Sequence, residues 1–296
     1  MLDITFYGVR GSTPCSGDHV ARYGGNTSCV VVSVPDEPPI ICDLGTGLRY
    51  FGADVADRGD GGPFRATALV THLHRDHVQG LPFFGPILQP DAELTIVGPV
   101  QDGQTLEAAI CEAIAPPMFP VPLSALPGHI SFRELRQTCL PIGSAVVSVF
   151  DVPHVGPTNG YRIDVGGASV AYLSDFQQPL VDNGEPWCPA GVLTAVRGVD
   201  VLIHDAQYDH EEFAKKATWG HCTVTFAVDV ARAAGAKRLV LFHHDPLHDD
   251  DWIDRAVAEA TDRADGEVEV LAAREGLTLR SESTRPSPMT PRPTMP

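Results

Sequence analysis

Residues 71–80 read THLHRDHVQG and directly follow an apolar run, ATALV, so that three histidines and one aspartate stand within six residues. Imidazole and carboxylate groups are common protein ligands of zinc and similar ions. If the apolar run is a strand, the two-residue period points His72 and His74 the same way. Asp76 and His77 then follow where they can hold a second ion. The stretch predicts a metal site, and the alternative is a histidine-rich surface turn.

Outward from this stretch, short apolar runs alternate with loops and helical patterns, without an internal repeat, which is typical of the α/β class. The runs predict strands at Ile4–Tyr7, Cys29–Val34, Pro39–Cys42, Ala66–Thr71, Leu94–Val97, Ala145–Asp151, Tyr161–Asp164, Ser169–Leu173, Val201–His204 and Arg238–Phe242. Helical spacing of apolar residues predicts helices at Thr105–Ile114, Thr223–Ala233 and Asp250–Ala264.

The pattern predicts one domain over residues 1–280, since 296 residues can bury a full core. Residues 281–296, SESTRPSPMTPRPTMP, are rich in Pro, Ser and Thr and are expected to be a disordered tail. Residues 115–128, APPMFPVPLSALPG, are too rich in proline for a helix. Two interpretations stay open for them, a loop over the site or a plain connection between elements.

The overall charge is acidic, −17 from 38 acidic and 21 basic residues. This disfavours a long nucleic acid as partner, because affinity for one depends largely on Lys and Arg. The seven cysteines include no CxxC pair, which suits reduced thiols in the cytoplasm. Neither a leader pattern nor a long apolar run is found, so a membrane location is not expected.

HxHxDH after a buried strand resembles the metallo-β-lactamase superfamily, and that resemblance implies a four-layer αβ/βα sandwich. In ICDLGTG, residues 41–47, Asp43 looks like the superfamily's strand-end aspartate, which braces the metal loop; a helix cap is its alternative interpretation. By the same resemblance, His154 supplies a third histidine to the first ion, Asp175 bridges both ions, and His243 closes the second, with His244 in reserve.

The resemblance thus implies two divalent ions, with zinc expected first and manganese or iron equally compatible with the mixed nitrogen and oxygen ligands. The expected metal ligands are His72, His74, Asp76, His77, His154, Asp175 and His243.

Two further segments, VLIHDAQY at 201–208 and WGHCTVT at 219–225, are similar to a pair in ribonuclease Z and related phosphodiesterases. The similarity implies that His221 is the general acid and that Asp205 orients it; both join Asp76 as expected catalytic residues. Ribonuclease Z would have glutamate where this chain has Asp205, which leaves the separation of the pair open. A loop histidine and a strand-end cap are the alternative interpretations.

The resulting expectation is hydrolysis of small phosphodiesters such as cyclic nucleotides by a metal-bound hydroxide. Arg10 and Asn26, in loops that resemble the same branch, are expected near the substrate. The first alternative is a ribonuclease Z-like endonuclease that processes tRNA 3′ ends, although residues 99–141 contain only Arg133 and Arg136 as basic residues. Further alternatives are a lactone, thioester or β-lactam hydrolase and a non-enzymatic binding protein. A second copy of the chain stays open as a partner.

Overall fold

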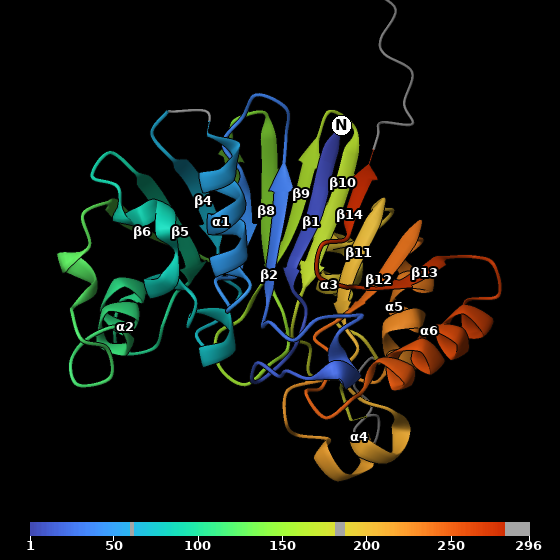
Figure 1. Cartoon of the computed structure of the whole chain (residues 1–296). Helices are drawn as coiled ribbons and strands as arrows, with labels where there is room; N and C mark the ends of the chain where they lie inside the picture. Colours follow the sequence, from blue (N-terminus) through green and yellow to red (C-terminus); the bar gives the residue numbers. More distant parts are fainter. Residues whose placement is uncertain (60–61, 181–186, 282–296) are drawn as a thin grey trace, which may run out of the picture.

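The protein is a four-layer sandwich in which two sheets pack face to face and helices cover their outer faces (Figure 1). The computed structural model describes residues 1–59, 62–180 and 187–281. The predicted fold class is therefore confirmed.

The first sheet has seven strands, in the spatial order β14 (Thr278–Ser281), β1 (Leu2–Gly8), β2 (Cys29–Ser33), β3 (Ile40–Cys42), β4 (Arg65–Leu69), β5 (Glu93–Pro99) and β6 (His129–Leu135). The pairs from β14 to β3 are antiparallel, and those from β3 to β6 are parallel. Its outer face is covered by α1 (Leu48–Arg58) and α2 (Leu106–Ala113).

The second sheet also has seven strands, in the order β13 (Glu269–Ala272), β12 (Arg238–Phe242), β11 (Val201–Asp205), β10 (Ala168–Leu173), β9 (Asn159–Val165), β8 (Ala145–Asp151) and β7 (Cys139–Ile142). The pairs from β10 to β13 are parallel and the others antiparallel. The helices on this side are α3 (Ala190–Ala195), α5 (Val224–Ala234) and α6 (Asp250–Ala264), while α4 (His210–Lys216) lies beyond the strand ends.

Three buried apolar clusters hold these layers together. One fills the space between the two sheets and includes Phe6, Tyr161 and Phe242. The other two lie between each sheet and its own helices. Burial of this apolar surface is the main favourable term in folding, and it fixes both sheets against each other. The strand ends of both sheets consequently meet along one edge.

That edge positions the candidate site. Asp43 follows β3 and His72 follows β4 in the first sheet, while Asp175 follows β10 and His243 follows β12 in the second. Ligands of sheets with parallel strands usually bind at the carboxyl ends of those strands. The loops after these strands therefore bring together residues from distant parts of the sequence.

Every predicted strand and helix is present, with small differences at the ends. The sequence patterns did not indicate β6, β7, β13 and β14, nor α1, α3 and α4, which are short or interrupted by polar residues and Gly52. Ser281 belongs to β14, which corrects the predicted start of the tail; residues 282–296 lie outside the described residues. None of the helices in the described ranges has the length and apolar character of a bilayer span.

The segment 115–128 packs beside the first sheet's outer face through Phe119, Leu123 and Leu126. None of its residues is among the described ones that line the cavity at the strand ends. The structure thus favours a connection between elements over a loop that covers the site.

Candidate metal centre

The histidine-rich stretch leaves the first sheet at the end of β4 and turns back as a short 3-10 helix, Arg75–His77. His74 is extended and caps this helix, and its carbonyl accepts a hydrogen bond from the His77 amide at 3.1 Å. The turn separates His72 and His74 from Asp76 and His77. The chain thereby offers two pairs of side chains to two different groups.

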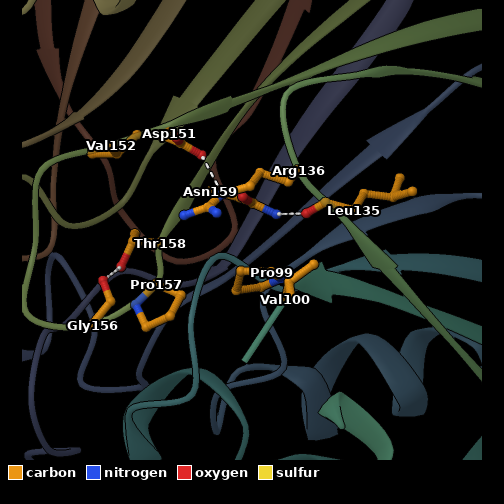
Figure 2. A pocket seen from close by; sticks show the side chains of 10 residues that line it. All are labelled: Pro99, Val100, Leu135, Arg136, Asp151, Val152, Gly156, Pro157, Thr158 and Asn159. Atoms are coloured by element: carbon orange, nitrogen blue, oxygen red, sulfur yellow. Dashed lines mark hydrogen bonds and ion pairs between the residues drawn. The ribbon is translucent and has the colours of Figure 1, made fainter. Parts of the chain in front are cut away.

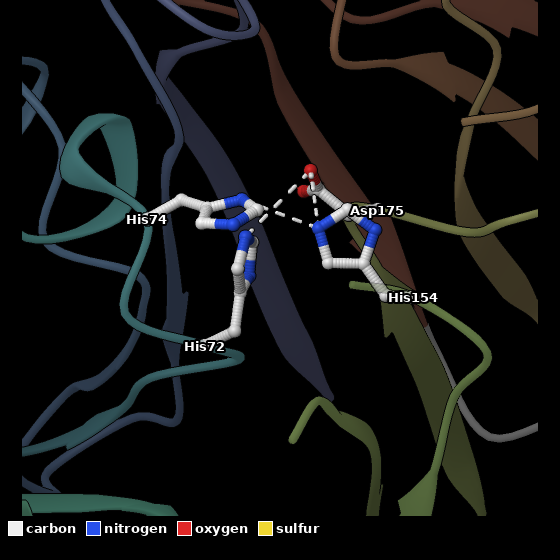
Figure 3. A group of neighbouring side chains, drawn as sticks. All are labelled: His72, His74, His154 and Asp175. Carbon is white, nitrogen blue, oxygen red and sulfur yellow. Dashed lines mark hydrogen bonds and ion pairs between the residues drawn. The ribbon is translucent and has the colours of Figure 1, made fainter. Parts of the chain in front are cut away.

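The first group combines His72, His74, His154 and Asp175, and Figure 3 shows the three rings and the carboxylate directed toward one another. His154 Nε2 lies 3.2 Å from His74 Nδ1, and both His72 Nε2 and His154 Nε2 lie 3.8 Å from Asp175 Oδ2. Ligand atoms about 2.1 Å from a tetrahedral ion are about 3.4 Å apart. The observed spacing suits one such ion.

The second group combines Asp76, His77 and His243. Nε2 of His77 and Nε2 of His243 lie 3.1 and 3.2 Å from Asp76 Oδ2. The same two nitrogens lie 3.1 and 3.4 Å from Asp175 Oδ1. Asp175 therefore directs one oxygen to each group, as a carboxylate that bridges two ions would.

Unsatisfied polar atoms also point to bound cations. Within the part of the chain that the structure describes, the buried atoms His72 Nε2, His77 Nε2 and Asp175 Oδ1 have no hydrogen-bond partner. Buried polar atoms without partners are costly, and native proteins rarely keep them. Each of these three atoms belongs to one of the two groups, so the residues present fit a pair of divalent cations.

The charges around His77 lead to the same inference. Burial alone would lower the pKa of His77, but the carboxylates of Asp76, Asp175 and Asp43 raise it well above its usual range. Burial and the neighbouring His77 lower the pKa of His72 well below its usual range, which keeps that ring neutral. Three buried carboxylates thus favour positive charge at this point. A bound cation would supply that charge and displace the proton from His77.

Asp43 holds the histidine loop from behind. Its Oδ2 lies 2.8 Å from His77 Nδ1, and its Oδ1 accepts a hydrogen bond from the Thr71 amide at 2.7 Å. The Thr71 hydroxyl donates to Asp43 and lies 3.1 Å from His72 Nδ1. A carboxylate behind a ligating histidine fixes the ring's tautomer and orientation. Asp43 also accepts a hydrogen bond from the Tyr172 hydroxyl, which links both sheets at this point.

Close backbone contacts position His243 and His154. A Cβ added at Gly11 would lie 2.3 Å from His243 Nδ1, and one added at Gly220 would lie 2.3 Å from a ring carbon of His154. His243 itself has a positive φ of 59°, a strained conformation that is typical of functional sites. The Ser12 amide donates to Asp76 Oδ2 at 2.8 Å. The loops that contain Gly11 and Gly220 thus restrict the positions of the His243 and His154 rings.

His221 and Asp205 lie next to the two groups. His221 Nδ1 is 2.9 Å from Asp205 Oδ2, so the aspartate reaches the ring despite being shorter than glutamate. The Phe176 amide donates to Asp205 Oδ2 and the Gln207 amide to Oδ1. The pair is thus fixed by the backbone on both sides.

A cavity of about 420 Å³ opens onto these residues. It is lined by Ser12, His74, Asp76, Asp175, Gln207, Tyr208, Lys216, Trp219, His221, His243, Asp245, Pro246 and Leu247. A smaller cavity of about 180 Å³ lies beside the loop that contains His154, and Figure 2 shows the hydrogen bond from Asn159 to Leu135 in its wall. Among the described residues, no member of the two groups lines the smaller cavity.

Two expected substrate residues do not face the cavity. The Arg10 side chain is fully buried and donates to the carbonyls of Gly24, Asp245 and His248. It therefore connects the loop around Gly24 to the loop that follows His244. The Asn26 amide group donates to Glu275. Each side chain is bonded within the protein, so the structure adds no support to the expected substrate contacts, which stay predictions. Between the adjacent histidines, only His243 joins the groups, since His244 Nε2 contacts the Ala273 carbonyl.

Several residues of the site were missed from the sequence. Gln207 Oε1 lies 2.8 Å from His243 Nδ1, and Ser12 reaches Asp76 through its backbone amide. Such contacts depend on loop geometry, which residue types do not reveal. Gly11 directly follows Arg10 and Gly220 directly precedes His221, and that adjacency was the available signal.

Comparison with known proteins agrees with this architecture. A ribonuclease Z of Haloarcula marismortui is 25% identical over an alignment of 328 residues, gaps included, which covers 95% of this chain and 97% of that protein. The metallo-β-lactamase fold protein YhfI of Bacillus subtilis has a TM-score of 0.70 at 19% identity, covering 94% of this chain and 98% of YhfI. The short form of human tRNase Z has a TM-score of 0.64 at 23% identity, with coverage of 94% and 98%.

Residues 52–244 match the family model described as the beta-lactamase superfamily domain. This match spans most of the chain and includes the residues of both groups. The superfamily fold implies divalent metal ions, in agreement with the clusters of His and Asp at the strand ends. The chain therefore belongs to the metallo-β-lactamase superfamily, and it is a metal-dependent hydrolase.

Proposed function

We propose that the protein hydrolyses small phosphodiesters, with cyclic nucleotides among its substrates. The observation that supports this choice is the His221–Asp205 contact beside the two metal groups. Hydrolysis of a phosphodiester releases an alkoxide, which needs a proton donor. A thioester leaves as a thiolate, which is stable without a proton, so the pair favours a phosphodiester over a thioester.

In this proposal, His72, His74 and His154 would hold one ion and Asp76, His77 and His243 a second, with Asp175 near both. Two divalent ions bound there would make water more acidic and offset negative charge on a phosphoryl group. Zinc is the proposed metal because imidazole and carboxylate suit it, although manganese and iron accept the same ligands.

His221 holds and delivers the proton. Its Nδ1 faces the Asp205 carboxylate, which fixes the tautomer and leaves Nε2 to carry the transferred proton. The ring lines the cavity together with Asp76, Asp175 and His243. A bound phosphodiester would therefore have the donor on one side and the metal groups on the other, and the donor would protonate the leaving oxygen.

The acidic character of the chain supports a small substrate over a long RNA. The formal charge is −17, and residues 99–141, which include α2 and β6, contain only two Lys or Arg residues, Arg133 and Arg136. All seven cysteines are free, which suits the proposed cytoplasmic location.

A second candidate is cleavage of precursor tRNA at the 3′ end. Several relatives along most of the chain are named ribonuclease Z, which favours this activity. A structural neighbour at 18% identity is instead named as a diphosphatase from the PhnP family. Proteins of different named activities thus share this fold.

One assay separates the candidates. The protein, loaded with zinc or manganese, is given a panel of cyclic nucleotides, an aryl phosphodiester and a precursor tRNA. We expect turnover of the aryl phosphodiester and of at least one cyclic nucleotide. Cleavage of the precursor tRNA alone would overturn the proposal in favour of the second candidate. Hydrolysis of thioesters or lactones alone would overturn both.

A further inference from the structure

The mouth of the 420 Å³ cavity has an apolar wall that the proposed chemistry does not use. Trp219 and Leu247 both line this cavity, and they are 63% and 84% exposed. A tryptophan side chain that is this exposed contributes little of the hydrophobic stabilisation that burial of its large ring would give. Binding pockets commonly combine such apolar surface with a few polar groups that orient the ligand. The wall therefore has the composition of a binding surface.

The backbone ties Trp219 to the reacting residues. The Trp219 amide donates to the Lys216 carbonyl at the end of α4, and the next amide, of Gly220, donates to Gln177 Oε1. The Gly220 carbonyl lies 2.8 Å from His154 Nδ1. The segment 219–221 thus contains the exposed indole, a contact to His154 and the proposed proton donor. The indole consequently has a defined position relative to the phosphodiester site.

The wall is not a second anion site. Lys216 is the only Lys or Arg among the described residues that line the cavity, and its Nζ lies 3.2 Å from Asp245 Oδ2. The same ammonium lies 4.7 Å from the centre of the Tyr208 ring and 5.8 Å from that of Trp219. Its charge is therefore neutralised by Asp245 and shared with two aromatic faces. An uncharged planar group suits this wall better than another phosphate.

We infer that Trp219 and Leu247 form a subsite for the base of a nucleoside phosphodiester, so that the base stacks on the indole while the phosphate lies at the metal groups. This inference rests on the proposed function and names the class of its substrate. Base stacking on an aromatic side chain strengthens binding by about 10- to 100-fold.

Binding without turnover tests the inference. Isothermal titration calorimetry compares adenosine 5′-monophosphate with ribose 5-phosphate, which has the same phosphate and no base, on zinc-loaded protein. We expect the nucleotide to bind at least tenfold more tightly. Trp219→Ala should remove this difference while leaving the affinity for ribose 5-phosphate unchanged, and Trp219→Phe should restore part of it. Trp187→Phe, at a tryptophan that packs on Phe226, is the control.

Equal affinity of the two ligands for the unaltered protein would overturn the inference. So would a Trp219→Ala variant that weakens both ligands equally, since this would indicate a structural role. Because neither measurement requires catalysis, a failed phosphodiesterase assay and a failed base subsite give different results. If the protein binds the nucleotide through Trp219 but cleaves only precursor tRNA, the result would support the base subsite and overturn the proposed function.

Discussion

Nδ1 of His221 lies 2.9 Å from Oδ2 of Asp205, and backbone amides on both sides hold that carboxylate in place. The two residues come from different segments, since Asp205 ends β11 and His221 precedes α5. Such a contact between an imidazole and a carboxylate sets which ring nitrogen holds the proton. This contact is the feature of the site that favours a substrate whose leaving group needs a proton, such as the alkoxide of a phosphodiester.

Replacing His221 should therefore have an effect that depends on the leaving group. We expect His221→Ala to lower kcat by about 10²- to 10⁴-fold on a cyclic nucleotide, because general acid catalysis is lost. A p-nitrophenyl phosphodiester should be nearly unaffected, since nitrophenolate leaves without a proton. Steady-state kinetics on both substrates measures the difference. His129→Ala, at an exposed histidine on β6, is the control; an equal loss on both substrates would contradict the assigned role.

Asp43→Asn should weaken metal binding without removing any ligand. The change keeps the shape of the side chain but loses the charge that faces His77 Nδ1 and the Thr71 donors. Loss of such a partner typically lowers metal affinity by about 10- to 100-fold. Competition with a chromophoric chelator measures the affinity. Tyr172→Phe, which removes one donor to Asp43, should have a smaller effect, and unchanged affinity in Asp43→Asn would refute the bracing role.

Gly11→Ala should disturb the second group alone. The added methyl would lie 2.3 Å from His243 Nδ1 and 3.0 Å from Gln207 Oε1, so the ring has to move. We expect one of two bound ions to be lost, as measured by native mass spectrometry. Gly191→Ala is the matched control, because nothing lies within 4 Å of its added methyl. Retention of both ions at unchanged affinity in Gly11→Ala would show that His243 is not needed where the structure places it.

Phe242→Ala should destabilise the fold by about 3–5 kcal/mol, the usual cost of emptying a buried aromatic site. The ring is fully buried between the sheets, where its centre lies 5.5 Å from that of Tyr172. Urea unfolding of the metal-free protein measures the free energy. Leu88→Ala, at a side chain that is 48% exposed, should change stability by less than about 0.5 kcal/mol. Similar values for both variants would contradict the assigned core.

Much of the fold could be predicted because its central strands are continuous apolar runs, as in β10 and β12. The short edge strands β13 and β14 have four residues each and little periodicity, so they depend on pairing with a neighbour. α1 contains Gly52, which lowers helix propensity. Tertiary packing decides such elements, and their local sequence does not.

The grouping of these side chains could be predicted because they follow apolar strands, directly or after a short loop, in the order that the superfamily shares; that they hold metal ions stays a prediction. The bonding of Arg10 and Asn26 within the protein could not be predicted, because the direction of a loop side chain depends on contacts far away in the sequence. Arg10 bonds to the carbonyl of His248, and no local pattern reveals that partner. The roles of Gly11 and Gly220 likewise follow only from the rings that pack on them.

The central claim is that side chains from four distant stretches hold two divalent ions. The most direct test is the metal content of the purified protein after zinc loading and dialysis, compared with that of a His72→Ala/Asp175→Ala variant, by inductively coupled plasma mass spectrometry. We predict two ions per chain in the unaltered protein and at most one, weakly held, in the variant. No retained metal in the former, or two ions in the latter, would contradict the account.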